Sequence, residues 1–556
     1  MKNKYFLYIM SIFWIMILSC DDEYLERYPL DSPSNETFLT NEAELEMAVT
    51  GVYNGLWYSF SGTPFSLVLD YTSDIGWDRN TNDMQVLALG VGNADNTFVS
   101  GVWQHFYAGI SRCNNILDKA EAIRDIVPEN KFNQLIAEVH FFRAYYYFYL
   151  NELYGGVPLV TNMLTLEESQ TPRASKQEVT DFILSELDLA KPYLLKDTHS
   201  TNKGRVNLAS ALALKSRVAL YNQRWEVAAA AAKEIMDLGS YTLHDDFGEL
   251  FSYAGERSNE IIFSIQYEEG LQVHAIANQF FSRLAKGFSG KIPVQSMVDS
   301  YECIDGKSID KSDLFNPKKP FENRDPRLTQ TIVLPQTKFI GYMFETHPDS
   351  VMTWNFNTTP ATRVSNTDVT NAYATFSGYL WRKYADIADR DAPAKSDIDI
   401  IVFRYAEVLL NYAEAKIEAN QIDQSVYDAI NLVRQRPSVE MPAIKEGMTQ
   451  QELRSRVRKE RKYELAAEGL RLFDIKRWEI AHEVMPGKLR GRIRGALLAE
   501  APSIDENGTP NYDNVSNQAK MRVIETRTYD ASRDYLWPIP RLEMEVNAKL
   551  EQNPNY

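Results

Sequence analysis

Apolar residues recur every three or four positions through most of the first 240 residues, which is the spacing of helices with one buried face. Asn41 with Glu44 and Ser175 with Glu178 form capping-box patterns, so each pair marks the start of a helix. The pattern predicts one helix from Asn41 and further helices over residues 101–126, 136–154, 175–194, 207–221 and 225–238.

Three of these helices carry more specific information. Residues 136–154 are so rich in Phe, Tyr, Leu and Ala that little of the helix circumference is polar, which predicts a centrally buried helix. Gly155 and Pro158 end it, because glycine tolerates left-handed dihedral angles and proline cannot continue the hydrogen-bond ladder. Residues 207–221 and 225–238 are rich in alanine, whose small side chain lets helix axes approach closely. They predict an antiparallel hairpin of tetratricopeptide type.

The helical pattern is interrupted twice. Residues 62–100 are rich in Gly, Asn and Asp and predict an exposed loop region, whereas residues 241–400 combine short β-like runs with loops. Helical patterns then resume at residues 403–420, 426–435 and 451–469, before a loop-rich tail. The sequence therefore predicts a mainly α fold, in which tetratricopeptide-like helical hairpins carry an inserted irregular, loop-rich subdomain with short β-strands.

The first residues have the pattern of a secretory signal. Lys2 and Lys4 precede an apolar run at 5–18, which is shorter than the ~20 residues needed to span a bilayer, so a transmembrane anchor is the less favoured alternative. Residues 17–20 (Ile-Leu-Ser-Cys) resemble a bacterial lipobox, which implies that Cys20 becomes the acylated first residue. The acidic residues 21–23 also resemble a surface-export signal. We expect a lipid-anchored protein of the outer membrane that faces the cell exterior.

These patterns divide the chain into four parts. They are a signal peptide at 1–19, an N-terminal helical region at 20–240, an irregular ligand-binding subdomain at 241–400, and a C-terminal helical region with its tail at 401–556.

Composition excludes several classes of protein. The chain has 59 Lys and Arg against 76 Asp and Glu, and this net charge of −17 is the wrong sign for displacing counterions from phosphates, so we expect no nucleic-acid partner. Three cysteines are too few for a disulfide scaffold. With 44% hydrophobic residues the chain can bury a large core, so its stability must come from packing.

Common catalytic and cofactor motifs are absent from the sequence. Residues 306–308 (Gly-Lys-Ser) end like a phosphate-binding loop, but Tyr301 stands where that motif needs its first glycine. Residues 78–82 alternate like the start of a calcium loop, but Asp83 and Leu89 replace its glycine and its bidentate carboxylate. We therefore predict no catalytic residue, no cofactor and no metal site.

A family resemblance is carried by motifs spread over nearly the whole chain. They lie at residues 142–145 (Phe-Arg-Ala-Tyr), 153–159 (Leu-Tyr-Gly-Gly-Val-Pro-Leu), 258–262 (Ser-Asn-Glu-Ile-Ile), 323–328 (Asn-Arg-Asp-Pro-Arg-Leu), 403–410 (Phe-Arg-Tyr-Ala-Glu-Val-Leu-Leu), 460–465 (Glu-Arg-Lys-Tyr-Glu-Leu), 471–474 (Arg-Leu-Phe-Asp), 477–478 (Arg-Trp), 536–540 (Leu-Trp-Pro-Ile-Pro) and 552–554 (Gln-Asn-Pro). Together with the lipobox they resemble the SusD/RagB-like nutrient-binding lipoproteins.

The resemblance implies a function. Members of that family are not enzymes; they capture oligosaccharides at the cell surface and deliver them to a SusC-like, TonB-dependent outer-membrane barrel, although some are associated with peptide uptake. A surface glycoside hydrolase and a protein-binding scaffold are the rival hypotheses. We expect these motifs to have a structural role. Arg404 and Glu407, and likewise Arg461 and Glu464, have the spacing at which side chains pair along a helix.

The binding site is predicted from composition, since the motifs do not place it. A glycan offers apolar C–H faces and a fringe of hydroxyl groups, so its capture needs exposed rings beside amide, carboxylate and guanidinium groups. Trp77, Asp78, Arg79 and Asn80 have this composition in a predicted loop. The second candidate is the pair Trp354 and Asn355 in the irregular subdomain. The alternative for both tryptophans is that they plug the core beneath a loop.

Overall fold

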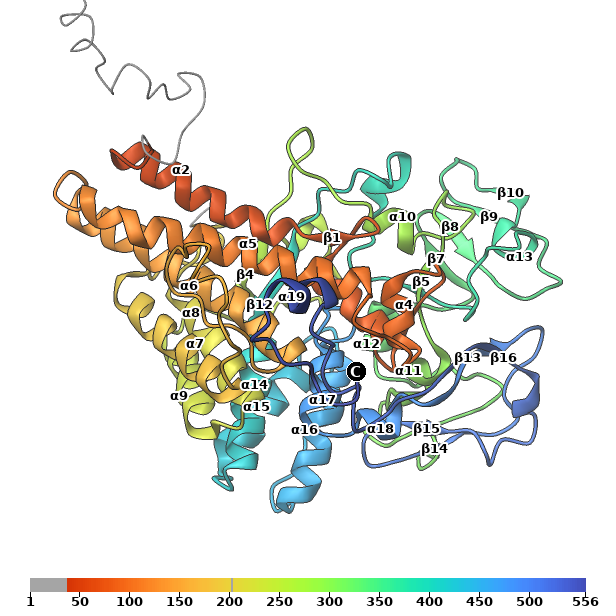
Figure 1. Ribbon diagram of the computed structural model, residues 1–556. Coiled ribbons are helices and arrows are strands. Elements are labelled where there is room, and N and C mark those ends of the chain that lie inside the picture. Colours follow the sequence, from red (N-terminus) through yellow and green to blue (C-terminus); the bar gives the residue numbers. More distant parts are fainter. Residues whose placement is uncertain (1–37, 202–203) are drawn as a thin grey trace, which may run out of the picture.

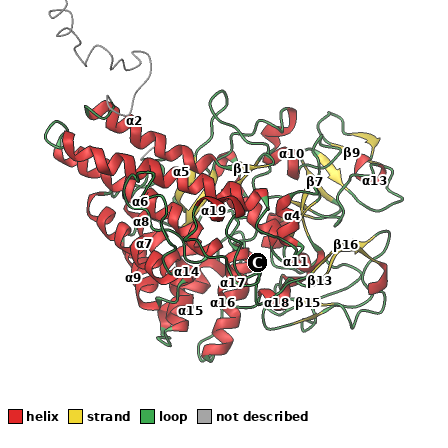
Figure 2. Ribbon diagram, in the orientation of Figure 1, coloured by secondary structure: helices red, strands yellow, loops and turns green. Residues whose placement is uncertain are grey.

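The computed structural model describes residues 38–201 and 204–556. Helices fill one side of the molecule, and short strands with long loops fill the other (Figures 1 and 2). The longer helices are α2 (Glu42–Tyr53), α5 (Thr97–Ala120), α6 (Glu129–Tyr154), α7 (Lys176–Ala190), α8 (Leu208–Tyr221), α9 (Trp225–Asp237), α14 (Tyr405–Glu418), α15 (Gln424–Arg434) and α16 (Gln450–Glu464). The predicted mainly α fold is confirmed.

The remaining elements are short. The short helices are α3 (Phe65–Val68), α4 (Asp83–Ala88), α10 (Ile276–Phe280), α11 (Gln295–Ser300), α12 (Arg327–Thr331), α13 (Thr367–Thr370), α17 (Arg471–Arg477), α18 (Ala481–Val484) and α19 (Arg541–Val546). The strands are β1 (Ser59–Phe60), β2 (Thr63–Pro64), β3 (Gly76–Asp78), β4 (Ile261–Ile265), β5 (Lys291–Pro293), β6 (Ile332–Val333), β7 (Thr337–Phe339), β8 (Tyr342–Phe344), β9 (Met352–Asn355), β10 (Thr362–Ser365), β11 (Leu380–Trp381), β12 (Ile400–Arg404), β13 (Gly487–Ile493), β14 (Ser503–Ile504), β15 (Pro510–Asn511) and β16 (Met521–Arg527).

The alanine-rich pair α8 and α9 forms the predicted hairpin. Ala228 and Ala232 are fully buried, and Ser216 Oγ donates a hydrogen bond to the Ala228 carbonyl across the interface at 3.1 Å. Helix α14, which comes almost 170 residues later, packs against both α8 and α9. The helices before and after the irregular segment therefore form one helical body (Figure 1).

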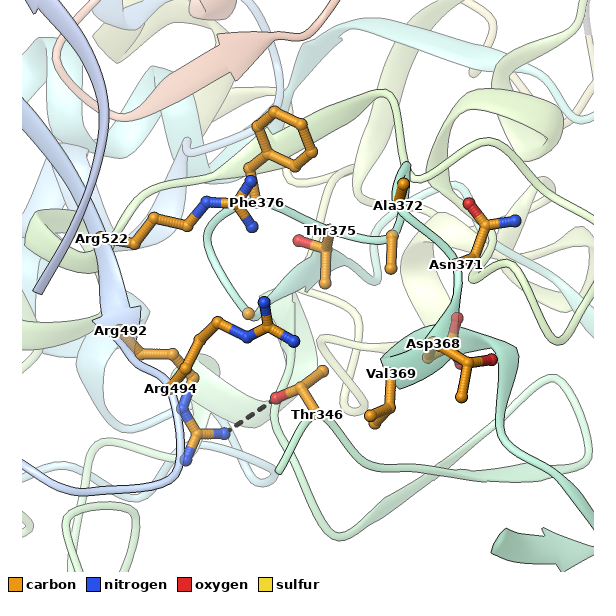
Figure 3. Close-up of a pocket in the computed structure, with 13 residues that line it drawn as sticks. Thr346, Asp368, Val369, Asn371, Ala372, Thr375, Phe376, Arg492, Arg494 and Arg522 are labelled. Carbon is orange, nitrogen blue, oxygen red and sulfur yellow. Dashed lines mark hydrogen bonds between the residues drawn. The ribbon is translucent and has the colours of Figure 1, made fainter. Parts of the chain in front are cut away.

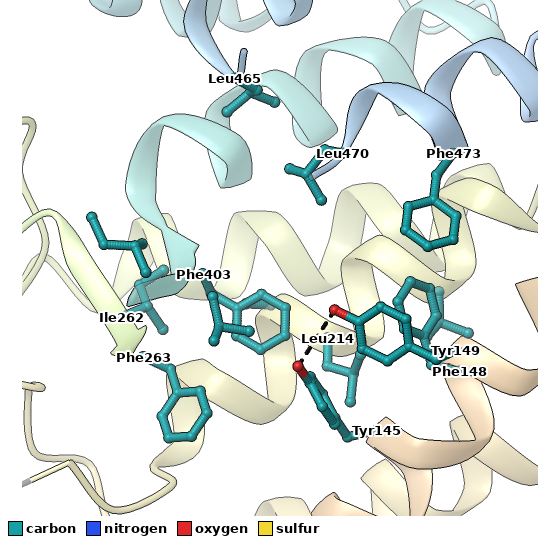
Figure 4. Close-up of a cluster of buried hydrophobic side chains, with 14 of the residues drawn as sticks. Tyr145, Phe148, Tyr149, Leu214, Ile262, Phe263, Phe403, Leu465, Leu470 and Phe473 are labelled. Atoms are coloured by element: carbon teal, nitrogen blue, oxygen red, sulfur yellow. Dashed lines mark hydrogen bonds between the residues drawn. The ribbon is translucent and has the colours of Figure 1, made fainter. Parts of the chain in front are cut away.

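Helix α6 is the centre of the main core. All of its residues from Phe141 to Tyr154 are buried, and Gly155 ends it with a φ of 77°, as predicted. Tyr145 and Tyr149 project from it toward Phe403 and Phe473 of the C-terminal half, and the two tyrosine hydroxyls are hydrogen-bonded at 3.4 Å (Figure 4). Aromatic rings thus join the two halves of the helical body.

The irregular segment leaves and re-enters the helical body through one antiparallel strand pair. Strand β4 pairs with β12, with Ile400 opposite Ile265. Between them, β7 to β10 form a four-stranded antiparallel sheet, while β5 pairs with β3 and β6 with β11. Strands β13 and β16 of the tail pair with each other and lie on the same side of the molecule (Figure 2). The boundaries at 241 and 400 stay a prediction.

The prediction of an exposed loop region over residues 62–100 is wrong for residues 65–78. This stretch is buried except for Ser66, because it folds into short helical turns and strand β3 beneath the tail. The Asp70 carboxylate, 1% exposed, accepts hydrogen bonds from the backbone N–H groups of Gly469 and Arg471 at 3.0 and 3.2 Å. Polar side chains in this stretch therefore bind backbone groups that are distant in the sequence, and they do not face solvent.

The predicted helical pairs of the motifs are also wrong, because the arginines pair with distant carboxylates. Arg404 binds Glu260, Glu464 and Glu468, and Glu407 binds Arg217 with a shortest N···O distance of 2.6 Å. These side chains lie in a buried network that we call the charge network, formed by Glu260, Asp325, Arg327, Lys383, Arg404, Arg434, Arg436, Glu460, Glu464 and Glu468. It ties α12 and Lys383 of the irregular segment to Arg404 and to α15 and α16 of the helical body.

The described residues contain no helix that is both long enough and apolar enough to cross a membrane. Cys20 and the predicted signal at 1–19 lie outside the described residues.

Candidate functional site

A cavity of about 230 Å³ opens where three remote segments of the β-rich side meet. Thr346 follows β8, residues 368–378 run from α13 into the next loop, and Arg492, Arg494 and Arg522 come from β13, its end and β16. Figure 3 shows the three arginines on one side of the cavity and α13 with Asn371 and Ala372 on the other.

Strand geometry places the arginines. Arg492 lies on β13, and Arg494 is the first residue of the turn after the strand's last residue, Ile493, which is only 4% exposed. Ile493 pairs with Met521, also buried, and the next residue along β16 is Arg522. The sequence analysis missed this cluster, although the alternation Arg-Ile-Arg between glycines at 491 and 495 was a signal for it.

Phe376 lies at the wall of the cavity and rests on Trp77. The two rings are stacked with centroids 5.4 Å apart, and the Arg522 guanidinium carbon lies 3.8 Å from the Phe376 centroid. Trp77 is 4% exposed, and its Nε1 donates a hydrogen bond to Glu525 Oε1 at 2.9 Å. The prediction that Trp77 is an exposed ring is therefore wrong: β3 pairs with β5, and this pairing buries the indole beneath the ring that does line the cavity.

The prediction that Asp78 is available to a ligand is wrong for the same reason. Its carboxylate is 1% exposed and forms an ion pair at 2.7 Å with the buried Lys291 of β5. Asn80 is exposed, and its backbone N–H and side-chain amide both donate to Asp78 Oδ1. Arg79 reaches the site: it donates to the carbonyls of Phe288 and Tyr373 at 2.8 and 2.5 Å.

Tyr373 is an exposed ring beside the cavity. Its side chain is 62% exposed, and its neighbours Ala372 and Ala374 are part of the cavity lining. Arg79 and Arg283 both donate to its carbonyl, and both guanidinium groups lie within 6 Å of its ring centroid. These hydrogen bonds fix the backbone of the loop at Tyr373, while the Tyr373 ring faces solvent. Sequence reasoning did not select Tyr373.

Trp354 and Asn355 lie on β9 in the four-stranded sheet. Trp354 is 41% exposed, and the guanidinium of Arg363, its cross-strand partner, lies 5.2 Å from the ring centroid. Asn355 Oδ1 accepts the backbone N–H of Asn357 at 2.9 Å. Among the described residues no hydrogen bond or ring contact joins Trp354 to residues 77–80, so the structure does not bring the two predicted candidates together.

A larger cavity of about 770 Å³ lies between residues 483–490 and 503–513. The one aromatic residue of its lining is Tyr512, which is 8% exposed and donates its hydroxyl to Asp299 at 2.8 Å. No exposed ring is offered there, so the smaller cavity beside Tyr373 fits the predicted composition of a glycan site better.

The lining of the smaller cavity contains one carboxyl group, Asp368. Its side chain is 5% exposed, burial raises its pKa to about 6, and Oδ2 has no hydrogen-bond partner among the described residues. Glycoside hydrolysis uses two carboxyl groups separated by about 5 to 9.5 Å. The lining supplies only one of them. No cluster of metal-ligating side chains occurs in residues 38–201 and 204–556.

Asp368→Asn is expected to become stabilising as pH rises. The pKa of Asp368 in the folded state, about 6, lies above its ordinary value of 3.8, so the folded state binds this proton more tightly than the unfolded state does. Ionisation of Asp368 therefore lowers the free energy of unfolding of wild type by about 3 kcal/mol between roughly pH 4 and pH 6. Relative to wild type, the thermal midpoint of the variant should therefore rise across that window and then stay level. Asp349→Asn, whose carboxyl is exposed, is the control. A difference between Asp368→Asn and wild type that does not vary with pH would contradict the burial effect.

Comparisons with known proteins agree with this fold. A family model described as the SusD family matches residues 259–556, and one described as starch-binding associating with outer membrane matches residues 23–220. SusD-like protein P2 of Formosa agariphila is 27% identical over 561 residues, which cover 98% of each chain.

Two solved structures show the likeness in three dimensions. A SusD-like carbohydrate-binding protein of Bacteroides fragilis is 30% identical with a TM-score of 0.80, and the match covers 93% of this chain and 100% of that one. Surface glycan-binding protein A of Bacteroides thetaiotaomicron, solved in complex with laminarihexaose, is 20% identical with a TM-score of 0.67. That match covers 93% of this chain and 100% of the other, and it shows a shared fold.

Proposed function

Because the chain belongs to the SusD family, we propose that it captures oligosaccharides at the cell surface without cleaving them and delivers them to a SusC-like, TonB-dependent barrel of the outer membrane. The observation that carries the proposal is the solvent-facing Tyr373 beside a cavity lined by Thr, Asn and Arg side chains. The ring offers a face for sugar C–H groups, and the polar side chains offer donors and acceptors for hydroxyl groups.

The location belongs to the same proposal. Association with the outer membrane is part of the description of the family model that matches residues 23–220. We propose that lipid on Cys20 anchors the protein there and that the protein faces the cell exterior, because the lipobox-like residues 17–20 supply an acylation site.

The two predicted candidates have different roles in this proposal. Trp77 acts indirectly, since it supports Phe376 from below, and Arg79 acts by holding the loop at Tyr373. Trp354 and Asn355 remain candidates for a second contact on a long ligand, because the Trp354 ring is accessible on the sheet.

Tyr373→Ala is expected to weaken oligosaccharide binding about fivefold or more, since a ring contact is worth about 1 kcal/mol. Calorimetry on the purified protein, with hexasaccharides of several chemistries, measures this loss. Tyr193→Ala removes another exposed tyrosine, 51% exposed, from the helical side and should leave the affinity unchanged. Equal affinities for Tyr373→Ala and wild type would exclude this ring as the platform.

The absence of catalysis and the delivery step need their own measurements. Incubation of each bound oligosaccharide with purified protein should release no new reducing ends, and a tagged copy should co-purify with a TonB-dependent barrel from solubilised outer membranes. New reducing ends would favour the hydrolase hypothesis. Binding of peptides in place of every oligosaccharide would favour the peptide alternative.

A further inference from the structure

Three arginines of the cavity lining have no carboxylate partner in the part of the chain that the structure describes. The Arg492 side chain donates one hydrogen bond, to Thr346 Oγ1 at 3.0 Å, whereas the side chains of Arg494 and Arg522 make no hydrogen bond or ion pair within the described residues. Arginines of the helical body are typically paired, as Arg454 is with Glu418 and Arg477 is with Glu414, both at 2.7 Å. The cavity therefore concentrates three guanidinium groups, and those of Arg494 and Arg522 have no hydrogen-bond acceptor among the described residues.

The charge of the lining has the opposite sign to that of the whole chain. Three guanidinium groups face one carboxyl, Asp368, whereas the chain carries a net charge of −17. Burial lowers the pKa of Arg522, and the positive charge of the neighbouring Arg494 lowers it further, as expected for a cation that lacks a counter-charge. Local charge, and not net charge, determines what such a cavity attracts.

The geometry of Arg522 leaves its donors free for a ligand. Its guanidinium group lies over the Phe376 ring, with its carbon 3.8 Å from the centroid. A planar guanidinium that stacks on a ring keeps its N–H edge available for bidentate binding of an oxyanion. Phe376 itself rests on the buried Trp77, which fixes the position of this donor.

Two further arginines lie on the adjoining surface. Arg79 and Arg283 both donate to the carbonyl of Tyr373 and form no ion pair within the described part of the chain. The exposed ring beside the cavity is therefore also flanked by positive charge. A cavity of about 230 Å³ is smaller than the roughly 300 to 1,000 Å³ of pockets for drug-sized ligands, so it fits one charged group or sugar unit of a longer chain.

Resting on the proposed function, we propose that the oligosaccharide is anionic and that Arg494 and Arg522 bind its carboxylate or sulfate groups beside a sugar ring on Tyr373. Both kinds of group present oxyanions to a guanidinium fork, so the cavity recognises their shared chemistry. Because these guanidinium groups are partly exposed to solvent, salt weakens their attraction for the anionic ligand.

Calorimetry with three hexasaccharides tests the proposal: oligogalacturonate for carboxylate, a carrageenan hexasaccharide for sulfate, and laminarihexaose as the neutral probe. At low salt at least one anionic probe should bind about tenfold more tightly than laminarihexaose, and only anionic binding should weaken as salt is raised. The two anionic arms identify which oxyanion is preferred.

Arg494→Gln and Arg522→Gln should each weaken binding of the preferred anionic probe about tenfold, because each removes charge-assisted hydrogen bonds. Arg112→Gln makes the same change of charge on an exposed residue of α5 in the helical body and should have no effect. Unchanged thermal midpoints show that the variants are folded.

The outcomes separate this inference from the proposed function. Binding of laminarihexaose as tight as that of both anionic probes, or unchanged anionic binding in the two arginine variants, would overturn the inference while leaving oligosaccharide capture in place. Failure of wild type to bind any oligosaccharide would overturn both.

Discussion

Glu464→Gln is expected to destabilise the folded protein by about 3 to 5 kcal/mol, because it removes one partner of a buried set of ion pairs. The Glu464 carboxylate is fully buried and receives hydrogen bonds from Arg404 and Arg436 at 2.8 and 2.7 Å and from Arg327 at 3.1 Å. Burial alone would raise its pKa, but Arg436, Arg404 and Arg327 together hold the pKa of Glu464 well below its ordinary range. The variant therefore leaves three buried guanidinium groups short of one negative charge.

Urea unfolding followed by tryptophan fluorescence measures this loss. Glu446→Gln makes the same chemical change on an exposed residue that forms no ion pair within the described residues, and it should change the free energy of unfolding by less than about 0.5 kcal/mol. A loss below about 1 kcal/mol for Glu464→Gln would mean that the charge network holds the fold less tightly than its geometry indicates.

Gly469→Ala is expected to cost about 3 to 5 kcal/mol, since backbone strain and a collision act together. Gly469 has a φ of +78°, and a Cβ atom there would lie 1.5 Å from the Ser66 carbonyl oxygen. Its N–H also donates to Asp70 at 3.0 Å, so the chain cannot move away without breaking that hydrogen bond. Because Ser66 and Asp70 lead into the strand that carries Trp77, binding at Tyr373 should weaken as well.

Gly447→Ala separates the two causes. Gly447 has a similar φ of +89°, but no atom lies within 4 Å of the Cβ position, so it should lose only the conformational cost of about 1 to 2 kcal/mol. Thermal unfolding of both variants gives the comparison. If the two alanine variants melted at the same temperature, the contact between Gly469 and Ser66 would not be as close as described.

The helices could be predicted because their signals are local. The Ser175 capping box and the alanine-rich hairpin occur where the spacing places them. The ion pairs could not be predicted in this way. Arg404 has extended dihedral angles (φ −141°, ψ 158°) at the N-cap of α14, so it is not on the helix and the spacing rule that pairs it with Glu407 does not apply.

Of the residues predicted to bind the ligand, Arg79 contacts the loop at Tyr373, whereas Trp77 and Asp78 are buried. Trp, Asp, Arg and Asn in succession are equally compatible with a binding loop and with a buried strand, and the choice depends on Lys291 and Glu525, which are far away in the sequence. Phe376 and the three cavity arginines also come from separate segments. Only the folded chain brings them together, so composition pointed to residues 77–80 and missed the side chains that rest on them.

The pairing of β4 with β12 has a consequence for how such proteins diversify. Both ends of the segment from residue 266 to residue 399 are fixed on neighbouring strands, which lie about 4.8 Å apart. Lengthening a loop whose two ends are fixed costs little conformational free energy, roughly 0.6 kcal/mol for each doubling of its length. Loops of this segment that lie outside the charge network can therefore be exchanged or lengthened. New ligand preferences can arise there while Arg327 and Lys383 keep their ion pairs with Glu460 and Glu468.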